Sequence, residues 1–437
     1  MNFAVPSHSA WQISSPPIRL HGLDALRGIA AVLVVLLHAG IPYMSQPLPY
    51  LVWPAMDIHP SITVNGLTWC TECFLMPLFF VLAGFFSQGL LISRGERDFL
   101  KGRTKRLLAT QLAAGLVILP ACLAIWILGW AGDGLYVFQG FPNVVLPPEL
   151  EAELYGWAHL WFLQYLYIYC LMLCGISWVA KRVRRSKLAE IDCKPSSFRG
   201  LDDLLVCIWK PLFPAIPCAL ILFCDTRIVL GFYQTFLPVI SKLAYYSIFF
   251  VVGVMFYRQR DTLHLHARFG KTYLFIASLV FAATLPLIHG HLTVPFTGLR
   301  LAQLALQLAL FACFTTFGLF AIFLRTRRGD NALTLYLAEA SFWVYLIHLP
   351  FVVLTQIAVA QLPVPTVGKF LLAGTTGLAL ALMTYHVFVR NTWLGEFLDG
   401  HCRFRALAMP DSEPACNHLP VPTPGSGTEK KLTTVSS

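Results

Sequence analysis

Ten apolar segments, each long enough to cross a membrane as a helix, dominate this sequence. A transmembrane helix needs about 20 mostly apolar residues to span the hydrocarbon core of a bilayer. The composition agrees, because 57% of the residues are hydrophobic and 12% are charged, whereas soluble domains carry about 25% charged residues. The sequence therefore predicts an all-α, polytopic integral membrane protein. The segments lie at about 25–44, 68–92, 107–130, 158–180, 205–223, 238–257, 272–289, 300–324, 333–358 and 367–389. The fifth contains Lys210 and three prolines, so it fits the pattern least well.

Lysine and arginine alternate between the two sides of these segments. The loops after the second, fourth, sixth and eighth segments hold 20 of them, and the loops after the odd-numbered segments hold three. Because positive residues in short loops stay on the cytoplasmic side, this pattern places both termini in the cytoplasm. The net charge of +10 thus reports topology. It indicates a lipid bilayer, and not nucleic acid, as the partner of the chain.

The composition divides the chain into residues 1–20, a transmembrane domain over 21–395 and a tail over 396–437. Residues 1–20 lack the early basic region and continuous apolar run of a signal peptide, so we expect the first segment to act as its own insertion signal. The tail is rich in Pro, Ser, Thr and Gly and can bury little apolar surface. We expect both end regions to be cytoplasmic and disordered.

Arg27 and His38 enclose an unbroken apolar run in the first segment. Eleven steps of 100° return to within about 20° of the start, so both side chains lie on one face of a helix, roughly 16 Å apart along its axis. Ionisable groups in a span usually face a bundle interior or a water-filled cavity. The helix offers a cation near one interface and an imidazole, a common general base, deeper in. The alternative is structural, with Arg27 as a topology anchor and His38 as a satisfied interior histidine.

Further cations precede the third segment, on the same side as Arg27. Arg103 and Arg106, with Lys101 and Lys105 beside them, would converge with Arg27 if the first and third segments are neighbours. Arginine suits phosphate because its planar guanidinium forms two parallel hydrogen bonds, so one interpretation is a site for a phosphate-bearing ligand. The other is that these residues only set the topology.

Polar side chains follow one face of the ninth segment. Thr334, Ser341, Tyr345, His348 and Thr355 recur at intervals of seven, four, three and seven, which keeps them on one side of a helix. Such a stripe is unusual against lipid, and it predicts a cavity or a polar contact between helices.

The remaining candidates lie near the ends of their segments. Glu72 belongs to the second, and His159 and Trp161 open the fourth, where an aromatic belt would explain Trp161 without any function. Tyr385 and His386 in the tenth complete the set.

Several kinds of site are missing from the sequence. It contains no G-x-S-x-G, P-loop or H-E-x-x-H motif, which argues against a hydrolase, an ATPase and a zinc protease. Cys70 and Cys73 form a C-x-x-C without a second pair or a nearby histidine cluster, so we expect packing or a disulfide and no metal site.

With these residues in view, the chain resembles the acyltransferase 3 family of membrane acyltransferases over about residues 20–395. The likeness rests on LDALRGIAAVLVVLLHA with its Arg-x10-His pair, on PLFFVLAGFF followed by Arg-x-x-Arg at 103–106, on HLWFL at 159–163 and on FWVYLIHLPF at 342–351. Within the family it is similar to the glucan biosynthesis protein C group, through HLWFL, YLIHLP and the closing YHVFVRNTWLGEFLDG. Ala83 departs from the family, which usually has Ser there, so this position is no nucleophile. Glu72 departs from the subgroup, which leaves the acceptor open.

The resemblance implies an acyl-CoA donor as co-substrate, with no bound cofactor. The donor would enter from the cytoplasm of a bacterial inner membrane, with its phosphates on Arg27, Arg103 and Arg106. It also implies a carbohydrate acceptor, a periplasmic glucan that receives succinyl groups. The candidates on the acceptor side are Glu72, His159, Trp161 and Ser341.

For the chemistry, the resemblance implies that His38 takes the proton of a sugar hydroxyl as the oxygen attacks the thioester. Tyr345 and His348 would orient the acceptor or polarise the carbonyl, and a covalent acyl-histidine route stays open. A dicarboxylic acyl group would need a cation near the thioester, and Lys242 is the basic candidate in the outer half of a span. A transporter of a glycan or small metabolite could use the same polar cavity, although no internal repeat supports it. A third reading is a structural partner in a glycan-assembly complex.

Overall fold

A computed structural model of the chain describes residues 21–46, 48–49, 51–132, 134, 156–187, 210–233, 235–260, 263, 267–325 and 331–399. All regular elements in these ranges are helices. In chain order they are α1 (His21–Gly40), η1 (Ile41–Tyr43), α2 (Ile62–Arg103), η2 (Thr104–Ala109), α3 (Thr110–Gly132), η4 (Ala158–Leu160), α5 (Trp161–Lys187), α7 (Leu212–Cys224), α8 (Arg227–Leu230), α9 (Ile240–Arg258), α11 (Gly270–Thr293), α12 (Gly298–Arg325), α13 (Ala332–Val359), α14 (Thr366–Thr384), η5 (Tyr385–Val389) and α15 (Trp393–Asp399).

Eight helical stretches of the described chain are long and apolar enough to cross a membrane. One of them, Ile62–Gly132, is 71 residues long and contains the second and third expected segments as α2 and α3. Large apolar side chains such as Leu116 and Leu299 are more than 80% exposed, as expected for helices that face lipid. The prediction of an all-α, polytopic membrane protein is confirmed.

The fifth expected segment differs from its prediction. Its helix, α7, has 13 residues, about 20 Å of rise, which is less than the roughly 30 Å of a bilayer core. Pro211 is the N-cap because proline suits the start of a helix and not its interior. The expected beginning, at residues 205–209, lies outside the described residues.

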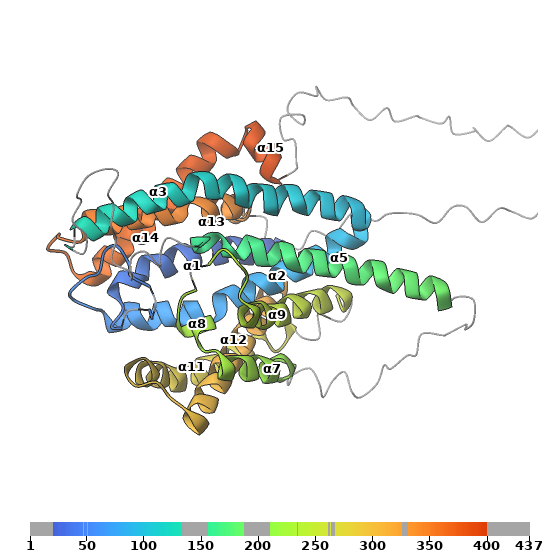
Figure 1. Ribbon diagram of the computed structural model, residues 1–437, viewed down its shortest axis with the longest axis horizontal. Helices are drawn as coiled ribbons and strands as arrows, with labels where there is room; N and C mark the ends of the chain where they lie inside the picture. The colour runs from blue at the N-terminus through green and yellow to red at the C-terminus, as the bar shows by residue number, and fades with distance from the viewer. Residues whose placement is uncertain are drawn as a thin grey trace, which may run out of the picture.

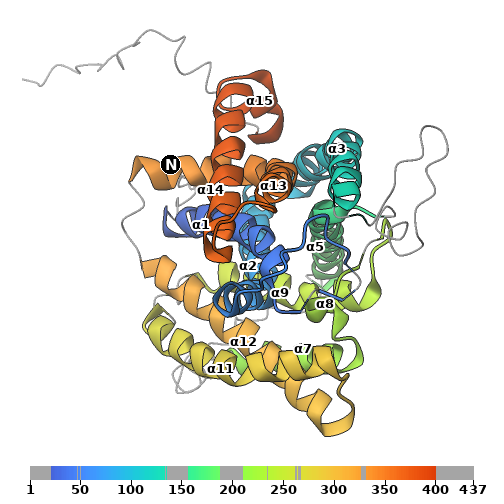
Figure 2. The same ribbon diagram turned by 90° about the vertical axis from the view of Figure 1, so that its left-hand side faces the viewer.

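The helices form a bundle in which α1 and α2 lie near the middle (Figures 1 and 2). α1 packs against α2, α13 and α14, and α2 packs against α5, α9 and α12. α7 and α11 pack on α12 at one edge. The contact between α2 and α9 depends on Gly84 and Gly253. A Cβ on Gly84 would lie 2.0 Å from the Phe250 carbonyl oxygen, and one on Gly253 would lie 2.0 Å from that of Val81.

The connection between the second and third spans is helical and not an open loop. Gly95 has φ 76° and ψ 170°, a left-handed conformation that favours glycine, and it kinks the long helix α2 there. The chain then stays helical through η2 into α3. This arrangement holds Arg103 and Arg106 on helical backbone.

The loop between η1 and α2 is tied to the far ends of other helices. The Trp53 indole donates to Gln356 Oε1 at 2.9 Å, and Gln356 Nε2 donates to the His38 carbonyl at 2.9 Å. Lys369 Nζ lies 2.7 Å from Asp57 Oδ2, and both side chains are buried. The loop therefore closes one end of the bundle around α1 and α13.

Helix α15 continues to Asp399, so the structured part of the chain extends beyond the expected boundary at residue 395. The expected disordered regions, 1–20 and the tail from residue 400 onward, lie outside the described residues.

Candidate functional site

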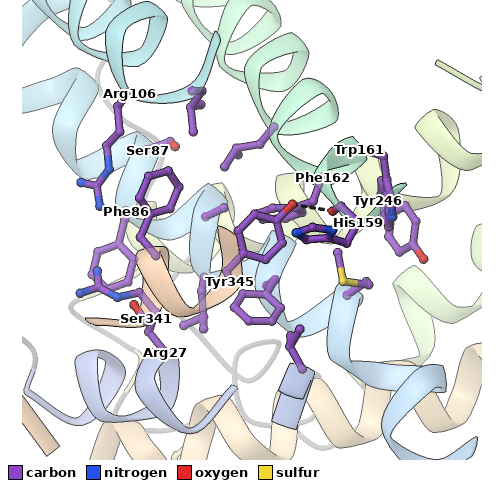
Figure 3. Close-up of a pocket in the computed structure, with 18 of the residues that line it drawn as sticks. Arg27, Phe86, Ser87, Arg106, His159, Trp161, Phe162, Tyr246, Ser341 and Tyr345 are labelled. Carbon is purple, nitrogen blue, oxygen red and sulfur yellow. Dashed lines mark hydrogen bonds between the residues drawn. The ribbon is translucent and has the colours of Figure 1, made fainter. Parts of the chain in front are cut away.

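One large cavity of about 2160 Å³ runs among the helices of the described chain. Most of the predicted site residues line it: Arg27, His38, Glu72, Arg103, Arg106, His159, Trp161, Ser341 and Tyr345. Figure 3 shows Arg27, Arg106 and Ser341 on one side of this pocket, His159 and Trp161 on the other, and Tyr345 between them. The cavity therefore brings together residues from α1, α2, η2, η4, α5 and α13 that are far apart in the sequence.

His38 contacts a second histidine in the wall of this cavity. His38 Nδ1 lies 2.9 Å from the Val34 carbonyl oxygen and 3.3 Å from His348 Nε2. His348 Nδ1 lies 2.9 Å from the Tyr345 carbonyl oxygen. Carbonyl oxygens only accept, so both Nδ1 atoms carry protons, and His348 Nε2 accepts from His38. In the described part of the chain His38 Nε2 has no partner, which makes it the basic atom that faces the cavity.

His348 itself is fully buried and stands behind His38, away from the cavity surface. Its ring is 4.9 Å from that of His38 and 5.2 Å from that of His159, edge to face in both cases. The structure thus assigns His348 a position in which it touches His38 and no ligand. His348 is not among the described residues that line the cavity, so its contact with acceptor or thioester stays a prediction, and its contact with His38 favours a positioning role.

Tyr345 and His159 are hydrogen-bonded to each other close to His348. The Tyr345 hydroxyl donates to the His159 carbonyl at 2.6 Å, shown dashed in Figure 3. His159 Nε2 donates to the Leu346 carbonyl at 2.9 Å. Among the described residues, the buried His159 Nδ1 has no partner. These bonds fix η4, which leads into α5, against α13 and leave one imidazole lone pair of His159 without a partner in the described chain.

Cations gather at the end of the cavity where Arg27 lies. The Arg27 guanidinium donates to the Ala338 carbonyl at 2.9 Å and lies 3.7 Å from Asp24. Within the described ranges, the buried Nε atoms of Arg27 and Arg103 lack hydrogen-bond partners. Buried donors without partners are costly, and phosphate oxygens would satisfy them. The lining cations are Arg27, Arg94, Arg103, Lys105, Arg106, Lys242, Arg260, Arg268 and Arg325.

The sequence did not identify four of these cations as candidate ligand-binding groups. Arg94, Arg260, Arg268 and Arg325 follow spans 2, 6 and 8, where topology alone explained them. Arg27 binds the Ala338 carbonyl of α13, and the guanidinium of Arg106, from η2, lies 5.1 Å from the centre of the Phe342 ring of α13, so both arginines reach the cavity beside this helix. The predicted convergence of Arg27, Arg103 and Arg106 on one space is present.

Trp53 and Gln356 were also missed. Gln356 is eleven residues after Tyr345, the same spacing that places Arg27 and His38 on one helical face, so the stripe on the ninth span could have been extended to it. Trp53, whose ring centre is 6.3 Å from that of His38, comes from a loop in which no periodicity marks its direction.

Some candidates lie elsewhere. The Ser341 hydroxyl donates to the Ala338 carbonyl at 2.7 Å, the same oxygen that Arg27 binds, so Ser341 is at the cation end and apart from Glu72, His159 and Trp161. Tyr385 and His386 are not among the described lining residues.

The cysteine pair and the histidines show no sign of a metal centre within the described ranges. Cys70 and Cys73 are free thiols, which supports packing over a disulfide. No group of three or more His, Cys, Asp or Glu side chains in the described chain is arranged to hold a metal ion.

The fold and this cavity define a class of protein. It is a polytopic membrane protein in which one cavity is lined both by a histidine that can act as a base and by a cluster of Lys and Arg side chains. A family model described as an acyltransferase domain matches residues 20–386. The chain therefore belongs to the acyltransferase 3 family of membrane acyltransferases.

Similar proteins named glucans biosynthesis protein C are found in Escherichia coli (strain SMS-3-5 / SECEC) and Escherichia coli O157:H7 (strain EC4115 / EHEC). Each is 26% identical over 200 residues, which cover 44% of this chain and 47% of the relative. The match thus spans about half the length of these curated relatives. No solved structure matches the chain.

Proposed function

We propose that this protein is an O-acyltransferase of a bacterial inner membrane. It moves an acyl group, a succinyl group in our proposal, from cytoplasmic acyl-CoA to a hydroxyl of a periplasmic glucan. The observation that carries the proposal is the single cavity of about 2160 Å³ that holds both the cations around Arg27 and the imidazole of His38.

The cation end fits the phosphate groups of coenzyme A. Nine Lys and Arg side chains line the cavity, Lys242 among them, against Asp24 and Glu72 as the lining carboxylates that the structure describes. Arginine forks bind phosphate in pairs of hydrogen bonds, and the Nε atoms of Arg27 and Arg103 are available for this. Because Arg27 and His38 are roughly 16 Å apart along α1, the extended pantetheine arm would carry the thioester from the cations toward His38.

His38 supplies the base. The sugar hydroxyl oxygen attacks the thioester carbonyl carbon while His38 Nε2 takes the hydroxyl proton. The carbon–sulfur bond then breaks, the thiolate of coenzyme A takes up the proton, and the sugar oxygen keeps the acyl group as an ester. The imidazolium that forms on His38 is stabilised by the bonds from its Nδ1 to the Val34 carbonyl and to His348 Nε2.

The likeness to the E. coli proteins named glucans biosynthesis protein C supports a glucan acceptor. The alternation of basic loops supports an orientation in which donor and acceptor enter the cavity from opposite sides of the membrane. α1 begins at His21, at the end that we place in the cytoplasm, and His38 lies near its other end. The acceptor would therefore reach His38 from the periplasm. Glu72, His159 and Trp161 line the cavity and are the candidates on the acceptor side.

The test is mass spectrometry of glycans from cells that carry the wild-type protein, His38→Ala or no protein, with membrane levels checked for each. We expect acyl substituents with wild type alone, because removal of a general base costs about 10²-fold to 10⁴-fold in rate. The mass increment identifies the acyl group. Glycans modified by His38→Ala at the wild-type rate would contradict the assignment of the base. Unmodified glycans with wild type would refute the glucan acceptor.

A further inference from the structure

An acidic and a basic side chain, Glu72 and Lys242, both lie in the wall of the cavity but do not form an ion pair with each other. Both side chains line the cavity, from α2 and from the first turn of α9. The structure shows no hydrogen bond or ion pair for the side chain of Glu72 or of Lys242 within the described chain. Unpaired charges away from water are costly, so this arrangement indicates groups kept for a ligand.

Aromatic rings surround the two charges. Lys242 is 6% exposed, and its Nζ lies 3.5 Å from the centre of the Trp161 ring. The ring of Tyr246 lies 5.5 Å from that of Trp161, and both rings line the cavity (Figure 3). We refer to Glu72, Trp161, Lys242 and Tyr246 as the Glu72–Lys242 subsite. Apolar walls with a few fixed polar groups are typical of small-molecule sites.

The charge balance of the subsite favours a neutral ligand. A carboxylate ligand would be attracted by Lys242 but repelled by Glu72 in a space of low dielectric constant. A hydroxyl group both donates and accepts, so it can donate to Glu72 and accept from Lys242 at once. A sugar carries several such groups at short spacing.

From this geometry, we infer that the Glu72–Lys242 subsite binds hydroxyl groups of the carbohydrate acceptor, with Lys242 as a specificity-determining residue. The inference rests on the proposed function and adds the place where the acceptor is held. Trp161, two residues after His159 at the start of α5, connects the subsite to the part of the cavity where His159, Tyr345 and His38 meet. A sugar held there presents a neighbouring hydroxyl to His38.

The experiment uses the purified full chain in detergent, with succinyl-CoA or acetyl-CoA as donor. The acceptor is glucan extracted from host cells that lack the protein. The variants are Glu72→Gln, Lys242→Met and the double variant. The double variant leaves no lone buried charge, so it should fold even if a single variant does not. Met76→Leu, a change of similar volume in the same wall of the cavity, is the matched control.

We expect the KM for glucan to rise about tenfold or more in the double variant, since it removes both hydrogen-bonding partners of the acceptor hydroxyl. The rise should be the same with either donor, and the KM for acyl-CoA should stay as in wild type and in Met76→Leu. A changed preference between succinyl-CoA and acetyl-CoA, with an unchanged KM for glucan, would assign the subsite to the acyl group instead and overturn the inference. Unchanged constants in all variants would also overturn it. Wild type that transfers from neither donor would refute the proposed function itself.

Discussion

At the scale of single residues, the interaction between His38 and His348 gives two histidines from distant spans a joint role in the proposed mechanism. His348 Nδ1 is held by the carbonyl groups of Val344 and Tyr345 at 3.1 and 2.9 Å. That leaves His348 Nε2 as an acceptor for the proton on His38 Nδ1. A hydrogen bond to Nδ1 fixes the ring orientation and the tautomer of the base, as the carboxylate does in hydrolase triads.

This arrangement gives a prediction for two variants of His348. His348→Gln keeps an acceptor oxygen near the position of Nε2, whereas His348→Leu fills the space without one. We expect kcat to fall about tenfold or more in His348→Leu, which is the effect of losing one bond to a charged group, and less in His348→Gln. The KM for acyl-CoA should stay constant in both, because His348 does not line the cavity. Equal kcat values for the two variants would mean that His348 only fills space.

Single residues also show what the sequence could and could not predict about the site. The common face of Arg27 and His38 follows from helical periodicity alone, and both line the cavity. The contact between His38 and His348 depends on which helices are neighbours, and no periodicity within one span contains that information. Arg260, Arg268 and Arg325 were hidden because the positive-inside pattern already accounted for them.

At the scale of helices, α2 and α9 depend on two glycines that let their backbones approach. The Cβ that Gly84→Ala introduces would lie 2.0 Å from the Phe250 carbonyl oxygen, so the helices must separate. We expect Gly84→Ala to lower the free energy of unfolding by about 1–3 kcal/mol or more. The measurement is thermal unfolding of the detergent-solubilised protein.

Gly175 in α5 is the matched control, since nothing lies within 4 Å of a Cβ placed there. Gly175→Ala should leave the unfolding temperature unchanged or raise it, because alanine is the better helix former. Equal effects at the two glycines would show that the α2–α9 contact is not tight.

The buried pair of Asp57 and Lys369 fixes the loop between η1 and α2 to the start of α14. Burial raises the pKa of Asp57, but hydrogen bonds from Lys369 Nζ and the His59 amide and the charge of Lys369 outweigh it, so the pKa is lowered below its ordinary value of 3.8. Because the pKa of Asp57 is lower in the folded protein, its carboxylate takes up a proton at a higher pH in the unfolded chain than in the folded one. The stabilisation is therefore complete at neutral pH and is lost as the pH falls through the lowered value.

We expect Asp57→Asn to destabilise the protein by about 3–5 kcal/mol at neutral pH, since it leaves the Lys369 charge buried without its partner. Below about pH 4 the difference from wild type should shrink, as followed by thermal unfolding at several pH values. The double variant Asp57→Asn/Lys369→Met should recover part of the loss. A difference that stays constant down to the acid range would show that the pair does not stabilise the fold.

The helices themselves were the most predictable part, and the exceptions have physical reasons. The bounds of α9, α12 and α13 fall within a few residues of their apolar runs, because only long apolar helices suit a bilayer. The start of the short α7 follows from Pro211, which is its N-cap, although the helix also accommodates Pro217 in its interior. The kink at Gly95 could not be foreseen, since a glycine among charged residues reads equally well as part of an open loop.

At the scale of the whole molecule, the topology rests on 20 basic residues on one side and three on the other. We expect a green fluorescent protein fused after Ser437 to fluoresce, and alkaline phosphatase fused after His59 to be active, because the first reports the cytoplasm and the second the periplasm. Phosphatase fused after Lys101 is the control and should be inactive. The reverse pattern would mean that the cations of the cavity face the periplasm and that the donor enters from that side.

The continuous helix from α2 through η2 into α3 has a consequence for affinity. A flexible loop that closes on a ligand must lose conformational entropy, which subtracts from the binding free energy. Here the backbone that carries Arg103 and Arg106 is rigid before the ligand arrives, so only the ligand and the arginine side chains lose freedom. The proposed donor site would therefore be preorganised, and the kink at Gly95 fixes where this helical connection begins.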